Sequence, residues 1–343
     1  MSGSGARNVK VTVEIEPFRL KEPFRITGHT MRKTDVLTVT LEQDGHVGRG
    51  EAAGVYYRPA EDVASNAKAV ESVRGVLEAG LSRQALQSLL PAGGARNAVD
   101  CALWDLEAKM SARPAWQIAE LERPRPLMTT FTLSAKTADE MAAGARGYRD
   151  AKAIKLKLTG EPEDADRVRA VREARPDVWL GVDANQGFTR TFLETLMPVF
   201  ISAKVALVEQ PFPIGHESLL DGFTSPIPIA ADESAQCFAD LVSLVGRFQT
   251  VNIKLDKCGG LTEGLAMARE ARRLGLEVMV GNMVGTSLAM APSFLVGQLC
   301  SVVDLDGPIF LAEDRNPAVR YRDGMIECPD ALWGSPSASG SLP

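Results

Sequence analysis

Hydrophobic and polar positions alternate along the first fifty residues with the period of two that is typical of β-strands. Strand-like runs occupy residues 9–16, 36–41 and 47–52, and Asp44-Gly45 marks a hairpin turn before the third run. This pattern predicts an antiparallel meander. The segment 23–32, between the first two runs, is polar and contains glycine, so we expect a flexible loop there.

Apolar residues then recur every three or four positions, as in amphipathic helices. The expected helices span residues 60–79, 82–90 and 95–111. With the strands before them, they predict an α+β domain over residues 1–122, and Pro124 and Pro126 mark its end.

From residue 123 onward, short apolar runs alternate with helical segments such as 164–174 and 261–274. The expected strands are 129–133, 154–158, 179–182, 205–208, 227–230, 250–255, 277–280 and 301–305. Eight such units predict an α/β fold, a parallel TIM-type barrel over residues 123–309. The helix after the last strand is weak, so the form expected is (β/α)7β. We expect residues 310–333 to pack back on the first domain and residues 334–343, rich in Ser, Gly and Pro, to be disordered.

Composition and charge narrow the class of function. The chain has 343 residues and a net charge of −6, and it lacks a basic tract, which argues against nucleic-acid binding. No run of roughly 18 apolar residues predicts a membrane span, and no apolar leader is evident. Five widely spaced cysteines without a Cys-x-x-Cys pair fit reduced thiols, so we expect a cytoplasmic protein.

The histidines exclude one large class of metal enzymes. His29, His46 and His216 are the three in the chain, and none has a partner two or four residues away. This argues against histidine-based zinc hydrolases and a Ser-His-Asp arrangement. A metal in this protein must be held mainly by carboxylates, which favours Mg²⁺.

Acidic residues end three consecutive strands of the predicted barrel: Asp183, Glu209 and Asp232. Functional residues of such barrels lie at these carboxyl ends, where closure of the barrel brings them together. A single one would be read as an ordinary surface acid. Three converging carboxylates repel each other strongly unless a cation lies between them, so we predict one Mg²⁺ site per chain.

Lysines flank these acids. Lys155 and Lys157 project from one face of the second strand, where each should lower the pKa of the other. Lys254 lies on the sixth strand, across the barrel mouth. Loss of a proton α to a carboxylate creates an enediolate, which a metal ion and an ammonium group stabilise. Although a single such lysine is usually solvated or salt-bridged, this placement predicts that Lys157 and Lys254 exchange protons on opposite faces of that carbon and invert it.

These motifs resemble those of the enolase superfamily, muconate-lactonizing-enzyme subgroup. The matching stretches are Lys155-Leu-Lys157, Val-Asp183-Ala-Asn185-Gln, Val-Glu209-Gln-Pro, Ala-Asp232-Glu-Ser and Asn252-Ile-Lys254. The resemblance implies an enolase-type barrel with an N-terminal capping domain. It also implies Lys157 and Lys254 as the acid/base pair with Lys155 as a helper, and the three acids as Mg²⁺ ligands. Asn185 and Asp256 are expected to support these groups from behind.

The predicted eighth strand carries Asp304 and Asp306, which alternation places on one side, facing the barrel mouth. Read alone, they could be a turn acid and a helix cap. The subgroup's dipeptide epimerases carry a matching Asp-x-Asp that binds the α-ammonium group of the substrate, so the resemblance implies a dipeptide. Thr132 matches a position that lines the substrate pocket. Arg25 and His29 are the candidates for contacting an acidic substrate side chain, although the arginine of the Ala-Glu epimerases aligns near Gly28-His29.

The resulting hypothesis is a Mg²⁺-dependent dipeptide epimerase, an isomerase acting on Ala-Glu or a related dipeptide. The predicted seventh strand is followed by Asn282 and not by the histidine of sugar-acid dehydratases, which argues against dehydration. An N-acyl amino-acid racemase, for example of N-acetylglutamate, and an o-succinylbenzoate synthase are alternatives that need no Asp-x-Asp. The third alternative is a barrel that binds metal and ligand without catalysing a reaction. Family barrels are commonly dimers or octamers, so we expect a homo-oligomer.

Overall fold

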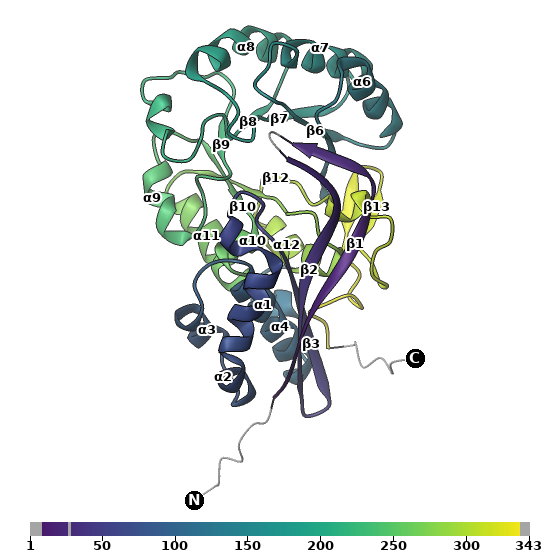
Figure 1. Ribbon diagram of the computed structural model, residues 1–343, viewed down its shortest axis with the longest axis vertical. Helices are drawn as coiled ribbons and strands as arrows, with labels where there is room; N and C mark the ends of the chain where they lie inside the picture. Colours follow the sequence, from purple (N-terminus) through teal and green to yellow (C-terminus); the bar gives the residue numbers. More distant parts are fainter. Residues whose placement is uncertain (1–8, 27–28, 337–343) are drawn as a thin grey trace, which may run out of the picture.

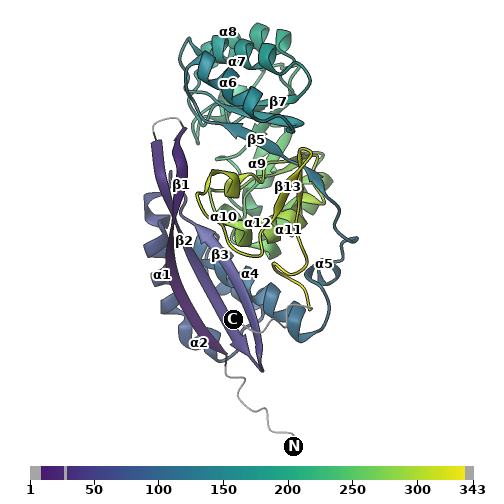
Figure 2. The same cartoon turned by 90° about the vertical axis from the view of Figure 1, so that its right-hand side faces the viewer.

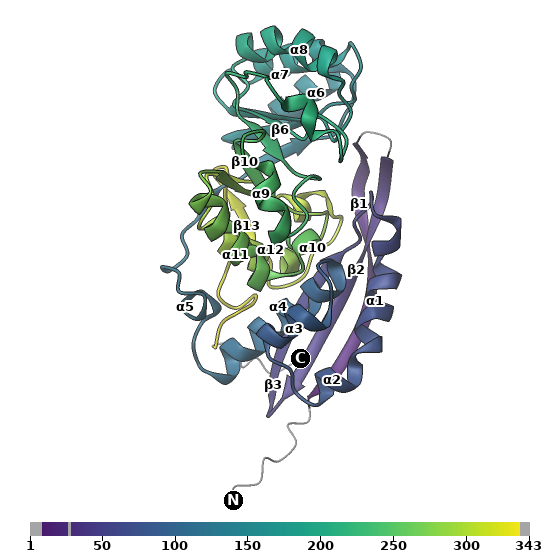
Figure 3. The ribbon, with the colours of Figure 1, turned by 90° about the vertical axis from the view of Figure 1, so that its left-hand side faces the viewer.

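The computed structural model describes residues 9–26 and 29–336. A three-stranded antiparallel sheet at the N-terminus stands beside a barrel of parallel strands (Figure 1). The sheet has the order β1 (Lys10–Ile26), β2 (His29–Gln43) and β3 (His46–Ala53). Helices α1 (Val63–Ser72), α2 (Arg74–Glu78), α3 (Arg83–Leu89) and α4 (Gly94–Met110) cover one of its faces (Figures 2 and 3).

Glycines set the distance between this sheet and helix α4. A Cβ atom at Gly48 would lie 2.3 Å from the carbonyl oxygen of Ala102, and one at Gly50 would lie 2.1 Å from that of Ala98. Only glycine permits such a close approach of strand and helix. The predicted helix 60–79 is instead a short 3-10 turn followed by α1 and α2. Asp62 begins α1 by accepting a hydrogen bond from the backbone nitrogen of Ser65, which separates this helix from the turn before it.

The predicted loop 23–32 is wrong for most of its length. Strands β1 and β2 continue through it as one long hairpin, with Phe24 opposite Met31 and Arg25 opposite Thr30. Residues 27 and 28 lie outside the described part. The backbone pairs across the hairpin, and the ring of Phe24 packs 4.7 Å from that of Phe310. These long-range interactions override the local signal of polar residues and glycine.

Eight parallel strands form the barrel sheet of the described chain, in the order β12-β11-β10-β9-β8-β7-β6-β5. They are β5 (Thr130–Leu133), β6 (Ala153–Lys157), β7 (Trp179–Asp183), β8 (Leu207–Glu209), β9 (Ile229–Ala231), β10 (Thr250–Ile253), β11 (Glu277–Val280) and β12 (Val302–Val303). The covering helices are α6 (Ala138–Gly147), α7 (Asp164–Ala174), α8 (Arg190–Ser202), α9 (Leu241–Leu244), α10 (Leu255–Cys258), α11 (Leu261–Arg273) and α12 (Ser287–Gly297). The enolase-type barrel with its cap is thus the observed fold. Each observed strand overlaps its predicted run, with ends that differ by at most two residues, and the last strand leads into a 3-10 turn, η4 (Gly307–Phe310).

Side chains complete the seam between β12 and β5. Leu305 donates its backbone N–H to the hydroxyl of Thr129 at 3.0 Å, and Thr132 donates its own to Asp306 at 2.7 Å. These bonds replace part of the backbone ladder that two full strands would form.

The C-terminal segment returns to the beginning of the barrel and to the cap. Strand β13 (Arg320–Arg322) pairs with β14 (Met325–Glu327), and β14 pairs with β4 (Leu127–Met128). The indole of Trp333 donates to the carbonyl of Arg49. The expectation of disorder from residue 334 is wrong at its start. The Gly334 backbone nitrogen donates to Asp105 at 2.8 Å, which ties the chain to helix α4. Residues 337–343 lie outside the described part. No helix of the described chain combines the length and apolar character that crossing a bilayer requires.

Candidate active site

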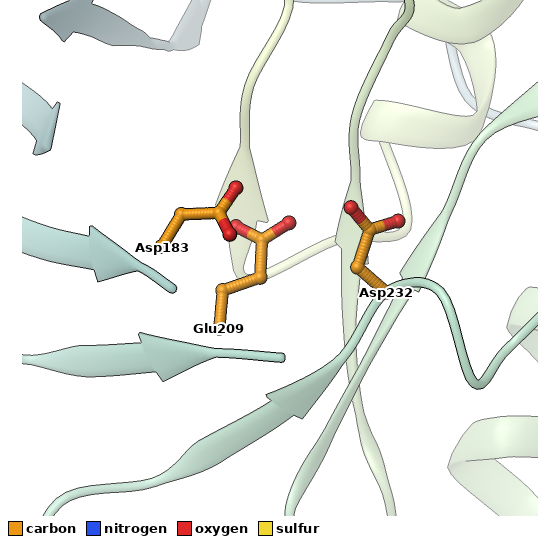
Figure 4. Close-up of side chains that lie close together, drawn as sticks. All are labelled: Asp183, Glu209 and Asp232. Atoms are coloured by element: carbon orange, nitrogen blue, oxygen red, sulfur yellow. The ribbon is translucent and has the colours of Figure 1, made fainter. Parts of the chain in front are cut away.

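Three carboxylates meet at the ends of neighbouring barrel strands. Asp183 ends β7 directly opposite Glu209, which ends β8, and Asp232 follows β9. Their ligand oxygens lie within 4.8 Å of one another (Figure 4). All three residues are buried. We call Asp183, Glu209 and Asp232 the carboxylate triad.

Lysines predicted from the sequence contact this triad directly. The ammonium group of Lys157 lies 2.5 Å from Asp183, and that of Lys254 lies 2.6 Å from the Oδ2 atom of Asp232. Lys155 lies 3.4 Å from Glu209 and also donates to Asp304. Strands β6 and β10 are four apart in the barrel order, so Lys157 and Lys254 approach the triad from opposite sides.

The expectation that Lys155 has a lowered pKa is wrong. Burial acts to lower the pKa of Lys155, but Asp304, Glu209 and Asp183 outweigh it and hold this pKa well above its ordinary value. The pKa of Lys254 is raised in the same way, because Asp232 and Glu209 outweigh burial. The sequence placed these acids at the barrel mouth, but it did not show that they lie close enough to Lys155 to outweigh both its burial and the neighbouring lysines.

Burial of these three carboxylates close together is electrostatically unfavourable. Burial and the charge of Asp183 raise the pKa of Glu209 to about 8, although Lys155 acts against them. A divalent cation bound to these carboxylates would have to compete with the ammonium groups of Lys157 and Lys254.

The triad fits a hard cation such as Mg²⁺ by its chemistry. Its donors are carboxylate oxygens from three elements, which is the ligand type that Mg²⁺ takes in proteins. Two further acceptors nearby, Asn185 Oδ1 and Glu233 Oε2, are buried without a hydrogen-bond donor among the described residues. Buried acceptors of this kind suit the surroundings of a hydrated cation. The residues present therefore fit a magnesium ion.

Asp304 and Asp306 lie at the seam and line the same cavity as the lysines. Asp304 accepts hydrogen bonds from Thr130 and Lys155, whose charge lowers the pKa of Asp304 in spite of its burial. Asp306 accepts from the backbone of Thr132, and burial together with Asp304 raises its pKa to about 7. Both acids therefore have a hydrogen-bond donor on β5 or β6, but Asp306 lacks the lysine partner that Asp304 has.

Asn185 and Asp256 differ in what they support. The backbone nitrogen of Asn185 donates to Asp183 at 2.8 Å, and its side-chain amide donates to Glu233. Asp256, expected behind the site, instead accepts from Ala53 and Asn97 of the cap. Strand β10 ends at Ile253, so residue 256 lies on the first turn of α10, where side chains no longer alternate.

The cavity above the triad has a largely apolar wall. Thr132, Lys155, Lys157 and Lys254 line it, together with side chains from the cap hairpin and the loops after β11 and β12: Phe24, Met31, Met283, Val284 and Phe310. Arg25 is exposed and is not among the lining residues. Its neighbour Phe24 faces the cavity, and strand alternation turns Arg25 away. The backbone of His29 pairs with Ile26, and its side chain lies outside the described part.

Sequence reasoning gave no role to two polar residues of this site, Asn252 and Lys257. Asn252 on β10 donates to Glu209 at 2.8 Å. Lys257, which is completely buried, donates to Asp232. The signal for Lys257 was a lysine three residues after Lys254, but a lysine after a strand end usually faces solvent.

Comparison with known proteins gives a consistent picture. Residues 8–119 match the model of the mandelate racemase / muconate lactonizing enzyme N-terminal domain, and residues 136–332 match the enolase C-terminal domain-like model. An L-Ala-D/L-Glu epimerase of Escherichia coli K12 is 40% identical over 322 residues, which are 93% of this chain and 99% of the relative. An N-acetyl-D-glutamate racemase of Pseudoalteromonas is 42% identical over 250 residues, 73% of this chain and 79% of the relative.

Solved structures show the same relationship. An enolase family member from Agrobacterium tumefaciens, with bound sodium and L-Ala-L-Glu, has a TM-score of 0.92 and 41% identity. The match covers 95% of this chain and 100% of that one. A dipeptide epimerase from Methylococcus capsulatus, complexed with Mg and L-Arg-D-Lys, has a TM-score of 0.88 and 29% identity over 94% of this chain and 97% of the other.

Proposed function

The chain belongs to the mandelate racemase / muconate lactonizing enzyme family of the enolase superfamily, and from this premise we propose that it is a Mg²⁺-dependent dipeptide epimerase. It is an isomerase that inverts the α-carbon of the C-terminal residue of a dipeptide. One observation carries this proposal: Lys157 and Lys254 reach the carboxylate triad from opposite sides of one cavity.

The two lysines divide the proton transfer between them. One ammonium or amine group lies on each face of the substrate α-carbon, so one lysine removes the proton and the other returns a proton to the opposite face. Bound Mg²⁺ would hold the substrate carboxylate and stabilise the negative charge that develops there. Lys155 lies beside Glu209 and Asp304 and adds positive charge to the same region.

The acidic end of the cavity favours a substrate with a free amino group. Asp306 is a buried carboxyl group with one backbone donor, and an ammonium group of the substrate would supply the missing charge partner. The similarity to an L-Ala-D/L-Glu epimerase supports Ala-Glu or a related dipeptide. The cavity wall also contains several apolar side chains, which leaves the preferred side chain to experiment.

An N-acyl amino-acid racemase is the second candidate, because one of the relatives is an N-acetyl-D-glutamate racemase. Exchange of the α-proton in D₂O separates the two. A dipeptide library and a set of N-acyl amino acids are incubated with the protein and Mg²⁺, and deuterium incorporation is measured by mass spectrometry. Exchange confined to N-acyl compounds would reject the dipeptide proposal.

Substitution of each lysine tests the proton transfer itself. We expect Lys157→Ala and Lys254→Ala each to abolish epimerisation, since each removes the proton carrier on one face. Each variant retains exchange of the α-proton of the one stereoisomer that presents it to the remaining lysine. Lys109→Ala, which removes a half-buried lysine of helix α4 that pairs with Asp105 and does not line the cavity, is the control. Wild-type turnover in either active-site variant contradicts the mechanism.

The proposal also includes the predicted cytoplasmic location and a homo-oligomer, either dimer or octamer. Size-exclusion chromatography with light scattering measures the assembly directly.

A further inference from the structure

Lys257 differs from the other lysines around the carboxylate triad. Lys155, Lys157 and Lys254 line the cavity, whereas Lys257 does not and has no exposed surface. Its ammonium group donates to the Oδ1 atom of Asp232 at 2.6 Å, and to the backbone carbonyls of Asp232 and Asn252 at 2.5 and 3.1 Å. Three acceptors use all three of its N–H donors, so this side chain has no capacity left for another partner.

Asp232 therefore carries two ammonium groups, one on each oxygen. Lys254 holds Oδ2 from the cavity side, and Lys257 holds Oδ1 from the interior. A lysine that exchanges protons with substrate has to release the carboxylate when substrate and metal bind. Only Lys254 is placed to do so, because it reaches the cavity.

The backbone turn that carries Lys257 is held rigidly. Helix α10 begins directly after Lys254, whose carbonyl accepts from the backbone nitrogens of Lys257 and Cys258. Arg96 of the cap donates to the carbonyls of Cys258 and Gly259 just beyond. The turn is thus fixed from both domains, and Lys257 cannot swing away without breaking these contacts.

From these observations we infer that Lys257 is a positioning residue: a permanent counter-ion that fixes Asp232 and offsets one negative charge of the triad before the metal binds. This inference rests on the proposed metal site. Lys257 and a divalent cation therefore compete for Asp232, because each of them neutralises the charge of this carboxylate. Lys257 stabilises the metal-free protein and makes metal binding weaker than three unpaired carboxylates would make it.

The test measures Mg²⁺ binding and thermal unfolding of the full-length protein, not turnover. Lys257→Met removes the charge and the donors, and Lys257→Gln removes the charge but keeps an amide donor. Calorimetric titration with MgCl₂ gives the dissociation constant, and melting curves in EDTA and in saturating Mg²⁺ give the metal-induced shift in Tm. Lys109→Met is the control, because Lys109 is a half-buried lysine that also donates to a carboxylate and a backbone carbonyl, and it does not line the cavity.

We expect both Lys257 variants to melt lower in EDTA, to recover more of their Tm than the wild type on adding Mg²⁺, and to bind Mg²⁺ at least tenfold more tightly. Binding becomes tighter because the variants no longer repel the cation. Between an ammonium group and a divalent cation a few ångströms apart, this repulsion is large enough to change the dissociation constant more than tenfold, even at an effective dielectric constant of about 20. Lys109→Met loses stability equally with and without Mg²⁺.

Three results would overturn the inference. Weaker Mg²⁺ binding in Lys257→Met than in Lys257→Gln would show that Lys257 acts only as a hydrogen-bond anchor. An equal loss of Tm with and without Mg²⁺, or failure of both variants to fold in Mg²⁺, would show a purely structural role. If the wild type itself binds no Mg²⁺, the proposed metal site fails as well, so the two failures are distinguishable.

Discussion

Replacing Asp306 by asparagine should strengthen the fold and weaken catalysis at the same time. The Asp306 carboxyl group is buried at the seam, where burial and the charge of Asp304 raise its pKa from 3.8 to about 7. An asparagine keeps an oxygen that can accept the N–H of Thr132, which now lies 2.7 Å from Asp306. The substitution therefore removes the charge with little change in shape.

The effect on stability depends on pH in a defined way. A carboxyl group with a higher pKa in the folded protein than in the unfolded chain destabilises the fold as the pH rises, because the unfolded chain releases its proton first. For Asp306 this loss develops between pH 3.8 and about 7. At about 1.4 kcal/mol for each factor of ten, it reaches at most about 4 kcal/mol above pH 7. Asp306→Asn should thus raise the free energy of unfolding at pH 8 and leave it nearly unchanged at pH 4.

The effect on activity has the opposite sign. Loss of a buried charge that pairs with the substrate ammonium group costs about 2–4 kcal/mol, or roughly 30- to 1,000-fold in kcat/KM for Ala-Glu. In the wild type, kcat/KM for the dipeptide should fall about tenfold per pH unit below pH 7, as the Asp306 carboxylate of the free enzyme is protonated. The variant should lose this component of the profile.

Urea unfolding at pH 4 and 8 and initial rates from pH 5 to 8 provide the measurements. Asp304→Asn is the control, because Lys155 holds the pKa of Asp304 below its ordinary value and its loss should destabilise the fold at pH 8. The reasoning is refuted if Asp306→Asn is less stable than the wild type at pH 8, or if it epimerises Ala-Glu with unchanged kcat/KM.

Two further predictions concern the metal and the cap. EDTA should abolish epimerisation, and added Mg²⁺ should restore it. Asp183→Asn removes the charge of one ligand and should weaken Mg²⁺ binding, measured by calorimetry, at least tenfold. Unchanged affinity would mean that the metal binds elsewhere. Gly50→Ala should lower the free energy of unfolding by about 1–3 kcal/mol because its Cβ atom would meet the carbonyl of Ala98 at 2.1 Å. Gly75→Ala in helix α2, where a Cβ atom meets nothing within 4 Å, should instead raise it by about 0.5–1 kcal/mol in the same urea titration.

The amino-acid sequence by itself determined the order of strands and helices. It also determined where the acidic and lysine side chains of the site lie along the chain. Most barrel strands are short and largely apolar and are followed by a polar residue. A buried parallel strand is largely apolar, and the barrel mouth is where polar groups reach solvent or ligand. That rule alone placed Asp183, Glu209 and Asp232 at one edge and Lys157 and Lys254 on opposite sides. These acids and lysines could be identified without knowing any distance between them.

Only the tertiary structure decided which charged groups pair. The pKa of Lys155 is raised by acids from three other strands, and no local pattern shows how close to its ammonium group they lie. Asp256 faces the cap because β10 ends at Ile253, two residues before the predicted end, and residue 256 already lies in α10, where side chains no longer alternate. The hairpin that carries Phe24 forms because its pairing and packing partners lie across the molecule. Lys257 is buried because the acceptors that justify the cost of burying its charge come from the ends of β9 and β10.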